Sequence, residues 1–248
     1  MLGNATLNSD TASHSTAPAD ASFLPGPVLL LGAPGVGKGT QAQLLVSRYG
    51  IPQISTGDLL RANIARGTEI GLKAKEIISS GRLVDDALVN AMVLARLQEP
   101  DTARGYILDG YPRTLDQAMF LDRTLAELSL PPALPVVAVN IIVAYEELLR
   151  RITGRRICPS CKSIYNIYTN APRLDALCDL ESAALIQRPD DTEEVFRERM
   201  KTFEQQTAPV IHHYRGLGRF EEVNGDQPVE AVLAAIESTL LKLRAAGR

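Results

Sequence analysis

The sequence has few cysteines, no excess of basic residues and no long hydrophobic run. Its 248 residues include three cysteines, 26 lysine and arginine residues and 29 aspartate and glutamate residues, for a formal net charge of −3. Three cysteines are too few for a disulfide scaffold and favour a reducing, cytoplasmic location. The charge balance argues against nucleic acid as the main partner. No apolar run is long enough to cross a membrane.

The first 26 residues lack the features of a targeting segment. They are rich in Ser, Thr, Ala, Asn and Pro, and they contain no lysine or arginine. A secretory signal needs a basic start and an apolar middle, and an organelle transit peptide is rich in arginine. We therefore expect a disordered tail at residues 1–26 and a folded domain at residues 27–248.

From residue 27 onward, short apolar runs alternate with amphipathic stretches. This alternation predicts an α/β fold, a doubly wound, five-stranded parallel sheet with helices on both faces. Strands are predicted at Val28–Leu31, Gln53–Ser55, Tyr106–Leu108, Val136–Ile142 and Arg219–Val223. Helices are predicted at Gly39–Tyr49, Thr56–Arg66, Gly71–Ser80, Asp86–Gln98, Leu115–Leu128, Tyr145–Ile152, Thr192–Tyr214 and Pro228–Leu243.

Two segments break the alternation. Residues 55–84 hold two predicted helices with no strand between them, and residues 154–191 hold glycine, proline, cysteine and short polar stretches with little helical periodicity. Both are predicted to be insertions, which leaves a core of residues 27–54, 85–153 and 192–248.

The most specific motif is Gly-Ala-Pro-Gly-Val-Gly-Lys-Gly-Thr at residues 32–40, directly after an apolar run. It matches G-x-x-x-x-G-K-[ST], in which glycines bring backbone N–H groups close to phosphate oxygens. Lys38 adds a charge near the β- and γ-phosphates, and Thr40 offers a hydroxyl to Mg²⁺. The following helix adds its N-terminal dipole. The predicted phosphate-binding residues are Gly35, Val36, Gly37, Lys38, Gly39 and Thr40.

Two further strand ends carry groups suited to phosphate and Mg²⁺. The helix after the second predicted strand has Arg61 on its first turns, and an arginine that stays protonated suits a second phosphate. Asp109 ends an apolar strand at the carboxyl edge of the sheet, where it can hold the hydration shell of Mg²⁺. Gly110 and Pro112 shape a turn that delivers Arg113 to the same cleft.

Six arginines gather at the borders of residues 154–191. Each of them alone is expected to be a solvated surface charge, but six at the borders of one insertion favour a site for phosphate groups. Phosphoryl transfer depends mainly on positioning and charge stabilisation, so it needs no histidine or cysteine base. The six are Arg151, Arg155, Arg156, Arg188, Arg197 and Arg199.

Taken together, the motifs resemble those of one enzyme family. Residues 28–245 resemble adenylate kinase of the long-lid type, a P-loop nucleoside monophosphate kinase, in GAPGVGKGT, STGDLLR, GRLVDDALV, GYILDGYPRTLDQA, RITGRR and QRPDD. The resemblance implies two mobile flaps, a nucleoside-monophosphate flap at 55–84 and a lid at 154–191. It also implies a monomer that catalyses MgATP + AMP ⇌ 2 ADP in adenine nucleotide homeostasis.

The resemblance carries roles over to individual positions. Gln117 matches the residue that reads the adenine edge. The implied catalytic residues are Lys38, Arg113, Arg155, Arg188 and Arg199. Beside the phosphate loop, the implied ATP contacts are Arg151, Arg155, Ile164, Tyr165 and Gln227. The implied AMP contacts are Thr56, Arg61, Arg82, Leu83, Val84, Gly110, Tyr111, Pro112, Arg113, Gln117, Arg188 and Arg199.

The three cysteines and one glutamate resemble the zinc-bearing lids of this family. The pattern Cys158-x₂-Cys161-x₁₆-Cys178-x₂-Glu181 supplies three thiolates and a carboxylate, a set that can hold a tetrahedral structural Zn²⁺. The fourth ligand in the family is Cys or Asp, so Glu181 departs from the pattern, and Asp179 is a competing ligand. A metal-free lid is the alternative.

Other functions share parts of this pattern. A uridylate/cytidylate kinase or a GTP-dependent AMP kinase has most of these motifs, although Thr56 together with Gln117 favours AMP as the acceptor. A nucleotide-sensing module without turnover is the alternative outside the enzymes, but it has no need of the arginine cluster. A GTPase is disfavoured because no Asn-Lys-x-Asp segment is present.

Overall fold

The structure is a computed structural model, and it describes residues 25–128 and 134–246. The tail predicted at residues 1–26 lies outside the described residues as far as residue 24. Gly26, which the prediction placed in the tail, belongs to the first strand.

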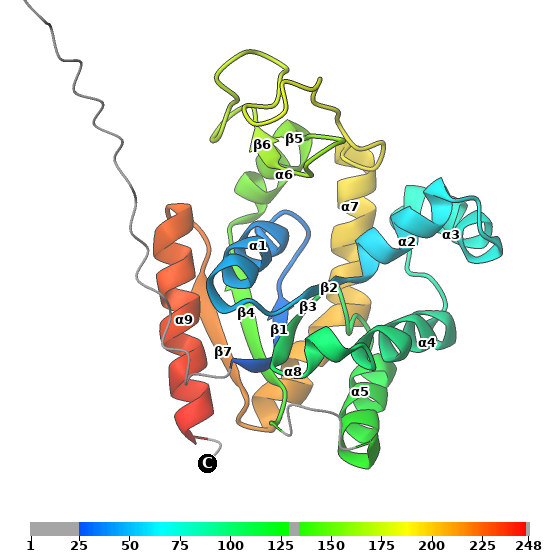
Figure 1. Cartoon of the computed structure of the whole chain (residues 1–248), viewed down its shortest axis with the longest axis vertical. Helices are drawn as coiled ribbons and strands as arrows, with labels where there is room; N and C mark the ends of the chain where they lie inside the picture. Colours follow the sequence, from blue (N-terminus) through cyan, green and yellow to red (C-terminus); the bar gives the residue numbers. More distant parts are fainter. Residues whose placement is uncertain (1–24, 129–133, 247–248) are drawn as a thin grey trace, which may run out of the picture.

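A central sheet of five parallel strands organises the molecule (Figure 1), which confirms the predicted α/β architecture. The strand order is β2-β3-β1-β4-β7, so that β1 lies in the middle and pairs with both β3 and β4. All residues of β1 are buried, as expected for a strand that is covered on both faces. The strands are β1 (Gly26–Leu31), β2 (Gln53–Ser55), β3 (Gly105–Asp109), β4 (Val137–Ile142) and β7 (Phe220–Asn224).

Helices cover the two faces of this sheet, and alternate residues of β1 serve them. Val28 and Leu30 pack into a core with α1, α6, α7 and α9, whereas Leu29 and Leu31 pack into a second core with α2, α4, α5 and α8. The helices are α1 (Lys38–Tyr49), α2 (Thr56–Ala65), α3 (Glu69–Ser79), α4 (Asp86–Leu97), α5 (Leu115–Leu128), α6 (Tyr145–Gly154), α7 (Glu193–Thr202), α8 (Ala208–Gly216) and α9 (Val229–Ala246). None of the helices in the described ranges is long and apolar enough to cross a membrane.

The single helix predicted at Thr192–Tyr214 is wrong. The structure has α7, one π-helical turn at Phe203–Thr207, and then α8. The N–H of Ala208 donates to the carbonyl of Phe203, five residues back. Pro209 has no N–H to donate, and its ring clashes with the carbonyl four residues earlier, so regular α-helical bonding cannot continue through this point.

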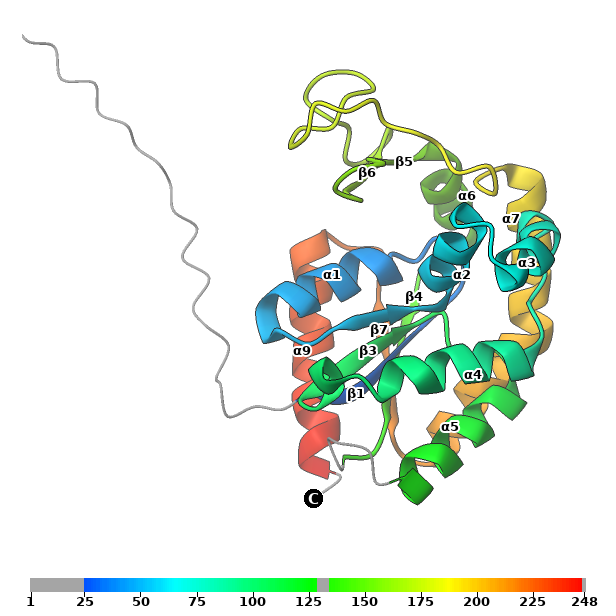
Figure 2. The ribbon, with the colours of Figure 1, turned by 45° about the vertical axis from the view of Figure 1, so that its right-hand side comes forward.

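The two predicted insertions stand out from the sheet and its helices. Helices α2 and α3 lie to one side of the sheet, and the segment of residues 154–191 lies above it (Figures 1 and 2). The latter contains an antiparallel pair of short strands, β5 (Arg155–Ile157) and β6 (Ile164–Asn166), which the sequence pattern did not predict. Helix α3 begins before the predicted Gly71, because the side chain of Thr68 caps it by accepting from the N–H of Gly71.

Candidate active site

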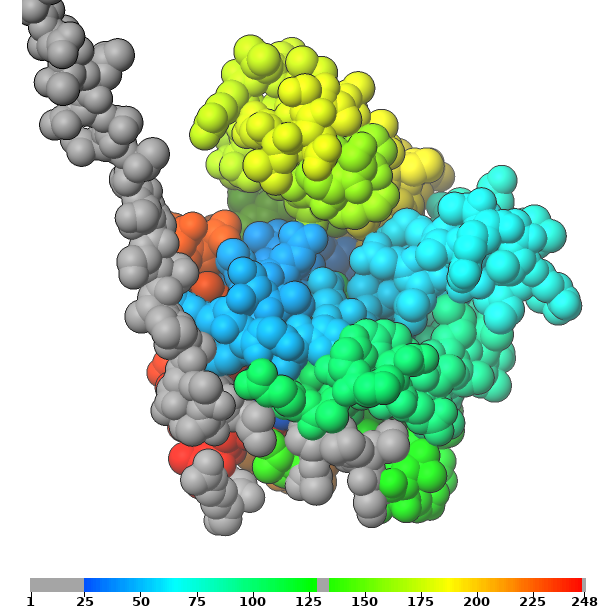
Figure 3. Space-filling model, in the orientation of Figure 1, coloured from blue at the N-terminus to red at the C-terminus, as the bar shows by residue number. Residues whose placement is uncertain are grey.

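A cavity of about 1380 Å³ opens at the carboxyl edge of the sheet, between the ends of β1 and β3 and the 154–191 segment. Figure 3 shows the yellow-green atoms of that segment above the blue atoms of α1. A typical pocket for one small ligand has about 300–1,000 Å³, so this cavity is large enough for more than one. A smaller cavity of about 60 Å³ adjoins it and shares Arg61, Arg113 and Arg199 with it.

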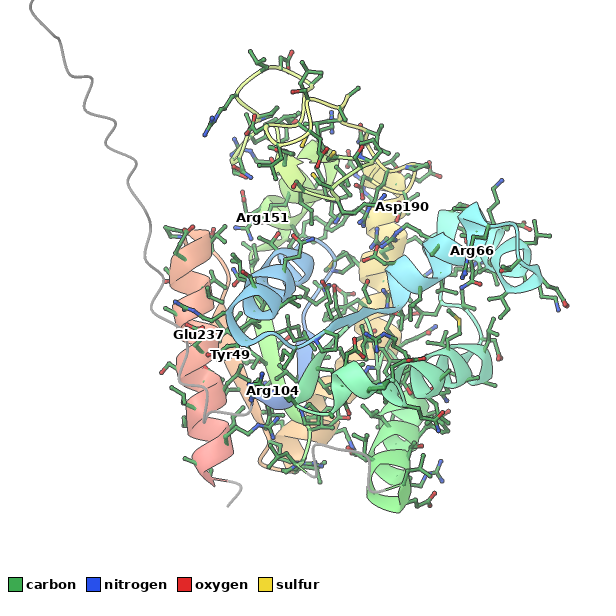
Figure 4. All side chains as sticks on the ribbon, in the orientation of Figure 1. Tyr49, Arg66, Arg104, Arg151, Asp190 and Glu237 are labelled. Carbon is green, nitrogen blue, oxygen red and sulfur yellow. The ribbon has the colours of Figure 1, made fainter. Side chains whose placement is uncertain are left out.

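The lining of the larger cavity is rich in positive charge, which suits polyphosphate ligands. Figure 4 labels Arg151 on α6 and Asp190 just before α7, both above the sheet. The lysines and arginines of the lining are Lys38, Arg61, Arg113, Arg151, Arg155, Lys162, Arg188 and Arg199. Its carboxylates are Asp58, Asp109, Glu147 and Asp226.

The predicted residues line the two cavities in two overlapping sets. Every residue of the ATP set lines the larger cavity, from Gly35 in the loop after β1 to Gln227 before α9. Nine residues of the AMP set line the smaller cavity: Thr56, Arg61, Arg82, Leu83, Val84, Gly110, Arg113, Gln117 and Arg199. The other three members, Tyr111, Pro112 and Arg188, line the larger one.

The phosphate loop leads into the N-terminus of α1, which no side chain caps. Gly35 and Gly37 have φ values of 92° and 100°, which only glycine adopts without strain. Gly37 is the N-cap of α1, and no side chain caps this helix N-terminus. A Cβ on Gly35 would lie 2.9 Å from the carbonyl oxygen of Leu148, so the loop also packs tightly against α6. The open N-terminus of α1 therefore faces the cavity as an anion site.

Lys38 occupies the centre of this loop and bonds to it. Its Nζ donates to the carbonyl oxygens of Gly32 (2.8 Å) and Ala33 (3.1 Å). Burial, and to a smaller extent the positive charges of Arg113 and Arg199, lower the pKa of Lys38 to about 8, against the opposing effect of Asp109. An anionic ligand would relieve this repulsion, so the charge of Lys38 is poised for a phosphate group.

Asp109 ends β3 beside the phosphate loop, as predicted. It lies in register with Leu30 of β1 and Ser55 of β2. A Cβ on Gly39 would lie 3.7 Å from its Oδ2, so the carboxylate faces the loop. Gln53 Nε2 donates to the same oxygen at 2.9 Å. Sequence reasoning missed this partner, because only the strand register brings the two residues together.

The turn after β3 fixes Arg113 at the junction of the two cavities. Its Nε donates to the carbonyl of Gly110 at 2.7 Å, and the hydroxyl of Thr56 donates to the same oxygen at 2.7 Å. Thr207, another residue that the sequence did not reveal, donates to the carbonyl of Arg113 at 2.9 Å. Burial, and then repulsion from Arg199, lower the pKa of Arg113 to about 10. The terminal nitrogens of Arg113 thus remain available for a ligand.

Two aspartates hold the arginines that border the 154–191 segment. Arg155 makes a two-point ion pair with Asp191, whose side chain is fully buried. Arg199 Nη1 donates to Asp190 Oδ2 at 3.1 Å. Burial, and then repulsion from Arg155, lower the pKa of Arg188 to about 10. The carboxylates of the QRPDD motif therefore orient guanidinium groups that would otherwise repel one another.

Not all of the predicted arginines reach the cavity. Arg197 is exposed on α7 and pairs with Glu193, and Arg156 donates to the backbone carbonyls of Thr153 and Arg155. Neither of them lines the cavity. Arg151 does line it, and its Nη1 donates to the carbonyl of Gly225 at 3.1 Å.

Ile164 and Tyr165, neighbours in β6, point to different surroundings. Ile164 reaches over the phosphate loop, since a Cβ on Gly39 would lie 3.8 Å from its Cδ1. Tyr165 is 7% exposed, and its hydroxyl accepts from the N–H of Asp179 at 2.9 Å. The ring of Tyr165 thus packs inside the 154–191 segment, while Ile164 is the residue placed above the loop.

The three cysteines come together in the 154–191 segment. Their sulfur atoms all lie within 4.8 Å of one another, and Cys161 Sγ lies 3.6 Å from Cys178 Sγ. The hydroxyl of Tyr165 lies 3.5 Å from Cys178 Sγ, and this contact lowers the pKa of the Cys178 thiol to about 7. No carboxylate of the described residues belongs to this group, so Glu181 stands outside it.

Cys158 and Cys178 begin two turns with the same hydrogen bonds. The N–H groups of Cys158 and Cys178 donate to the carbonyls five residues later, and their own carbonyls accept from the N–H groups four residues later. Lys162 and Ser182 take corresponding positive φ values of 64° and 52°. In this correspondence, Glu181 occupies the place of Cys161. The side chain of Asp179 instead accepts from the N–H of Arg173 at 2.8 Å, away from the sulfurs.

Comparison with known proteins agrees with this geometry. The model of the adenylate kinase family matches residues 30–219. An adenylate kinase of Kosmotoga olearia is 48% identical over 217 residues, which cover 87% of this chain and 99% of the relative. An adenylate kinase of Archaeoglobus fulgidus is 46% identical over 217 residues, with 88% and 99% coverage. One of Nitrosococcus oceani is 46% identical over 214 residues, with 86% and 97% coverage.

These matches span the phosphate loop, both insertions and the arginines around the cavity, and they confirm the resemblance seen in the sequence motifs. The chain belongs to the adenylate kinase family of nucleoside monophosphate kinases.

Proposed function

We propose that this kinase transfers the terminal phosphoryl group of ATP to AMP and forms two ADP, in the balance of the cell's adenine nucleotides. The observation that carries the proposal is the junction of the two cavities, because Arg113 and Arg199 line both of them. The phosphate loop lines only the larger cavity, and Gln117 lines only the smaller one. A donor in the first and an acceptor in the second would place their phosphates beside the same guanidinium groups.

The residues that line the two cavities have different roles in the proposed transfer. The open N-terminus of α1 and Lys38 hold the donor phosphates, and Arg113 positions the acceptor phosphate. Arg155, Arg188 and Arg199 stabilise the charge that spreads over the transferring group. None of these steps needs a side chain to act as a base, so the lack of histidine in the lining is no obstacle. We infer that residues 55–84 and 154–191 close over the two nucleotides and exclude water.

Asp109 and Thr40 fit a magnesium ion that enters with ATP. Both line the larger cavity, and carboxylate and hydroxyl oxygens are the ligands that Mg²⁺ prefers. When bound, the ion neutralises charge on the donor phosphates. Asp109 would hold it through water, and the hydrogen bond from Gln53 Nε2 fixes the orientation of this carboxylate.

The cysteines fit a structural zinc ion. Sulfur atoms of a tetrahedral zinc site lie about 4 Å apart, given Zn–S distances of about 2.3 Å, and the three sulfurs here meet this spacing. By its place in the second turn, Glu181 is the residue that we assign to the fourth position, and its carboxylate, which lies outside the cysteine group, would have to turn inward to coordinate the ion. The ion would serve to stabilise the 154–191 segment, since four protein ligands leave no open position.

We further propose that the enzyme works as a cytoplasmic monomer. The resemblance of the sequence motifs to long-lid adenylate kinases supports the monomer. Three cysteines without a disulfide suit a reducing compartment.

The test is a panel of nucleotides with purified protein and Mg²⁺. ATP with AMP should give ADP, whereas UMP, CMP or GMP as acceptor, and GTP as donor, should react poorly. Efficient use of UMP or CMP would assign the protein to the pyrimidine kinases, and preference for GTP would make it a GTP-dependent AMP kinase. Binding of ATP and AMP without formation of ADP would instead support a sensor.

A further inference from the structure

Gln117, at the floor of the smaller cavity, belongs to a closed ring of hydrogen bonds with two residues outside the proposed site. Gln117 Nε2 donates to Asp86 Oδ1 at 2.7 Å. The hydroxyl of Thr114 donates to Asp86 Oδ2 at 2.5 Å, and it accepts from the N–H of Gln117 at 3.2 Å. Gln117 is only 2% exposed, and Asp86 is the first residue of α4. The ring therefore ties the start of α4 to the start of α5.

The partners of Gln117 dictate which way its amide faces. Its Oε1 accepts from the backbone N–H of Arg113 at 2.7 Å. A backbone N–H can only donate, and an ionised carboxylate can only accept. A flipped amide would set the carbonyl oxygen of Gln117 against the carboxylate of Asp86 and its NH₂ group against the N–H of Arg113. Both contacts would be lost, so Asp86 and Arg113 together lock the amide.

With its orientation fixed, the amide of Gln117 still has one hydrogen-bond donor and one acceptor for a ligand. Nε2 has two hydrogens and gives one to Asp86, and Oε1 has two lone pairs and uses one for Arg113. The remaining N–H and lone pair lie in a fixed order along the edge of the amide. Gln117 can thus make one donated and one accepted bond to a base, with an order that it cannot reverse.

That order separates the two purines. Adenine offers a donor on its exocyclic amine and an acceptor at the adjacent ring nitrogen, whereas guanine offers an acceptor and a donor in the same two places. A freely flipping amide would fit both bases in one pose, but a locked amide fits one of them. We propose that Asp86 is a positioning residue that makes the acceptor site select adenine over guanine by fixing the amide of Gln117. This inference rests on the proposed use of the smaller cavity for AMP.

The test compares the binding of AMP and GMP, measured by titration calorimetry, in the wild type and in matched variants. Asp86→Asn keeps the shape of the side chain but offers either a donor or an acceptor to Gln117, so only the N–H of Arg113 still favours one orientation of the amide. Asp86→Glu keeps a carboxylate. Asp85→Asn changes the neighbouring aspartate, which caps α4 through the N–H groups of Ala87 and Leu88 and has no bond to Gln117.

The wild type should prefer AMP, and Asp86→Asn should reduce the ratio of GMP to AMP dissociation constants by about threefold to tenfold. This is part of the discrimination expected of a two-point contact to a base, because the N–H of Arg113 still favours one orientation of the amide. Asp86→Glu and Asp85→Asn should keep the wild-type ratio. Asp86→Ser, whose hydroxyl also donates or accepts, should show the same reduction of the ratio. It replaces Asp86→Asn in the test if that variant folds poorly. The same ratio should hold for kcat/KM with the two acceptors.

If Asp86 had a purely structural role, its replacement would weaken the binding of AMP and of GMP by the same factor. An unchanged ratio of the two dissociation constants in Asp86→Asn and Asp86→Ser would therefore overturn the proposal. A different result would reject the proposed function: the wild type would form no ADP from ATP and AMP. The binding ratio still reports on the lock in that case.

Discussion

Replacing Lys38 with methionine should abolish most of the activity and leave the fold almost as stable as before. Two terms in the stability of the folded protein oppose each other. The shift of the Lys38 pKa from 10.5 to about 8 means that carrying its charge costs about 3 kcal/mol in the folded state. The bonds from Nζ to the carbonyls of Gly32 and Ala33 offset that cost by about 3 kcal/mol.

The free energy of unfolding of Lys38→Met should therefore lie within about 1 kcal/mol of the wild type at neutral pH, because methionine fills the same space with an unbranched chain. Turnover should fall about 10²- to 10³-fold, the usual effect of removing one group that stabilises transition-state charge. Urea denaturation and initial rates of ADP formation measure the two quantities. Ser47→Ala, an exposed change on α1 that lines neither cavity, is the control and should leave both nearly unchanged.

The pH dependence tests the same reasoning from another side. The unfolded chain holds the proton of Lys38 up to about 10.5, whereas the folded protein releases it near 8, so the unfolded state binds more protons between these values. The wild type should gain stability relative to Lys38→Met as the pH rises from about 8 to 10.5. Near-normal turnover in Lys38→Met, or a large loss of stability with no pH-dependent difference, would refute this account of Lys38.

Four further predictions follow from the site. The kcat/KM for ATP should fall above about pH 8, as Lys38 in the free enzyme loses its charge; a flat profile to pH 10 would contradict this. Arg113→Lys should lower kcat/KM for AMP about 10²-fold and change stability by less than about 1 kcal/mol, because an ammonium group cannot reproduce the fork of a guanidinium. Asp191→Ala should lower the free energy of unfolding by about 3 kcal/mol, since it leaves Arg155 unpaired, whereas Arg197→Ala, the exposed control, should cost less than about 0.5 kcal/mol. Protein prepared without added zinc should contain about one zinc per chain, and a chelator should lower its melting temperature; a zinc content near zero would reject the metal site.

The sequence predicted those features that short stretches of chain determine. The parallel sheet follows from apolar runs that alternate with helical patterns, and the phosphate loop follows from glycines and a lysine at fixed spacing. The pattern missed β5 and β6, because these short strands lie in a segment of glycine, proline, cysteine and polar residues with no helix between them, and they pair with each other and not with the main sheet. It also joined α7 and α8 into one helix, although Pro209, the second residue of α8, cannot continue the regular hydrogen bonding from α7.

The parts of the site that the sequence could not predict are contacts between distant segments. Gln53 meets Asp109 only because β2 and β3 pair in that register. Asp86 meets Gln117 only because α4 and α5 begin side by side. Local spacing carries no signal for either pair. The same limit applies to the arginines, for which burial and packing decided that Arg199 faces the cavity while Arg197 points into solvent.

The central claim is that a phosphoryl group is transferred from a nucleotide in the larger cavity to a nucleotide in the smaller one, and not to water. The most direct measurement mixes the enzyme with Mg²⁺, AMP and ATP that carries a label in its terminal phosphoryl group, and then separates the products early in the reaction. The account predicts that the label appears in ADP, with two ADP formed for each AMP consumed and almost no labelled inorganic phosphate. Labelled inorganic phosphate as the main product, or its release at the same rate without AMP, would contradict the account.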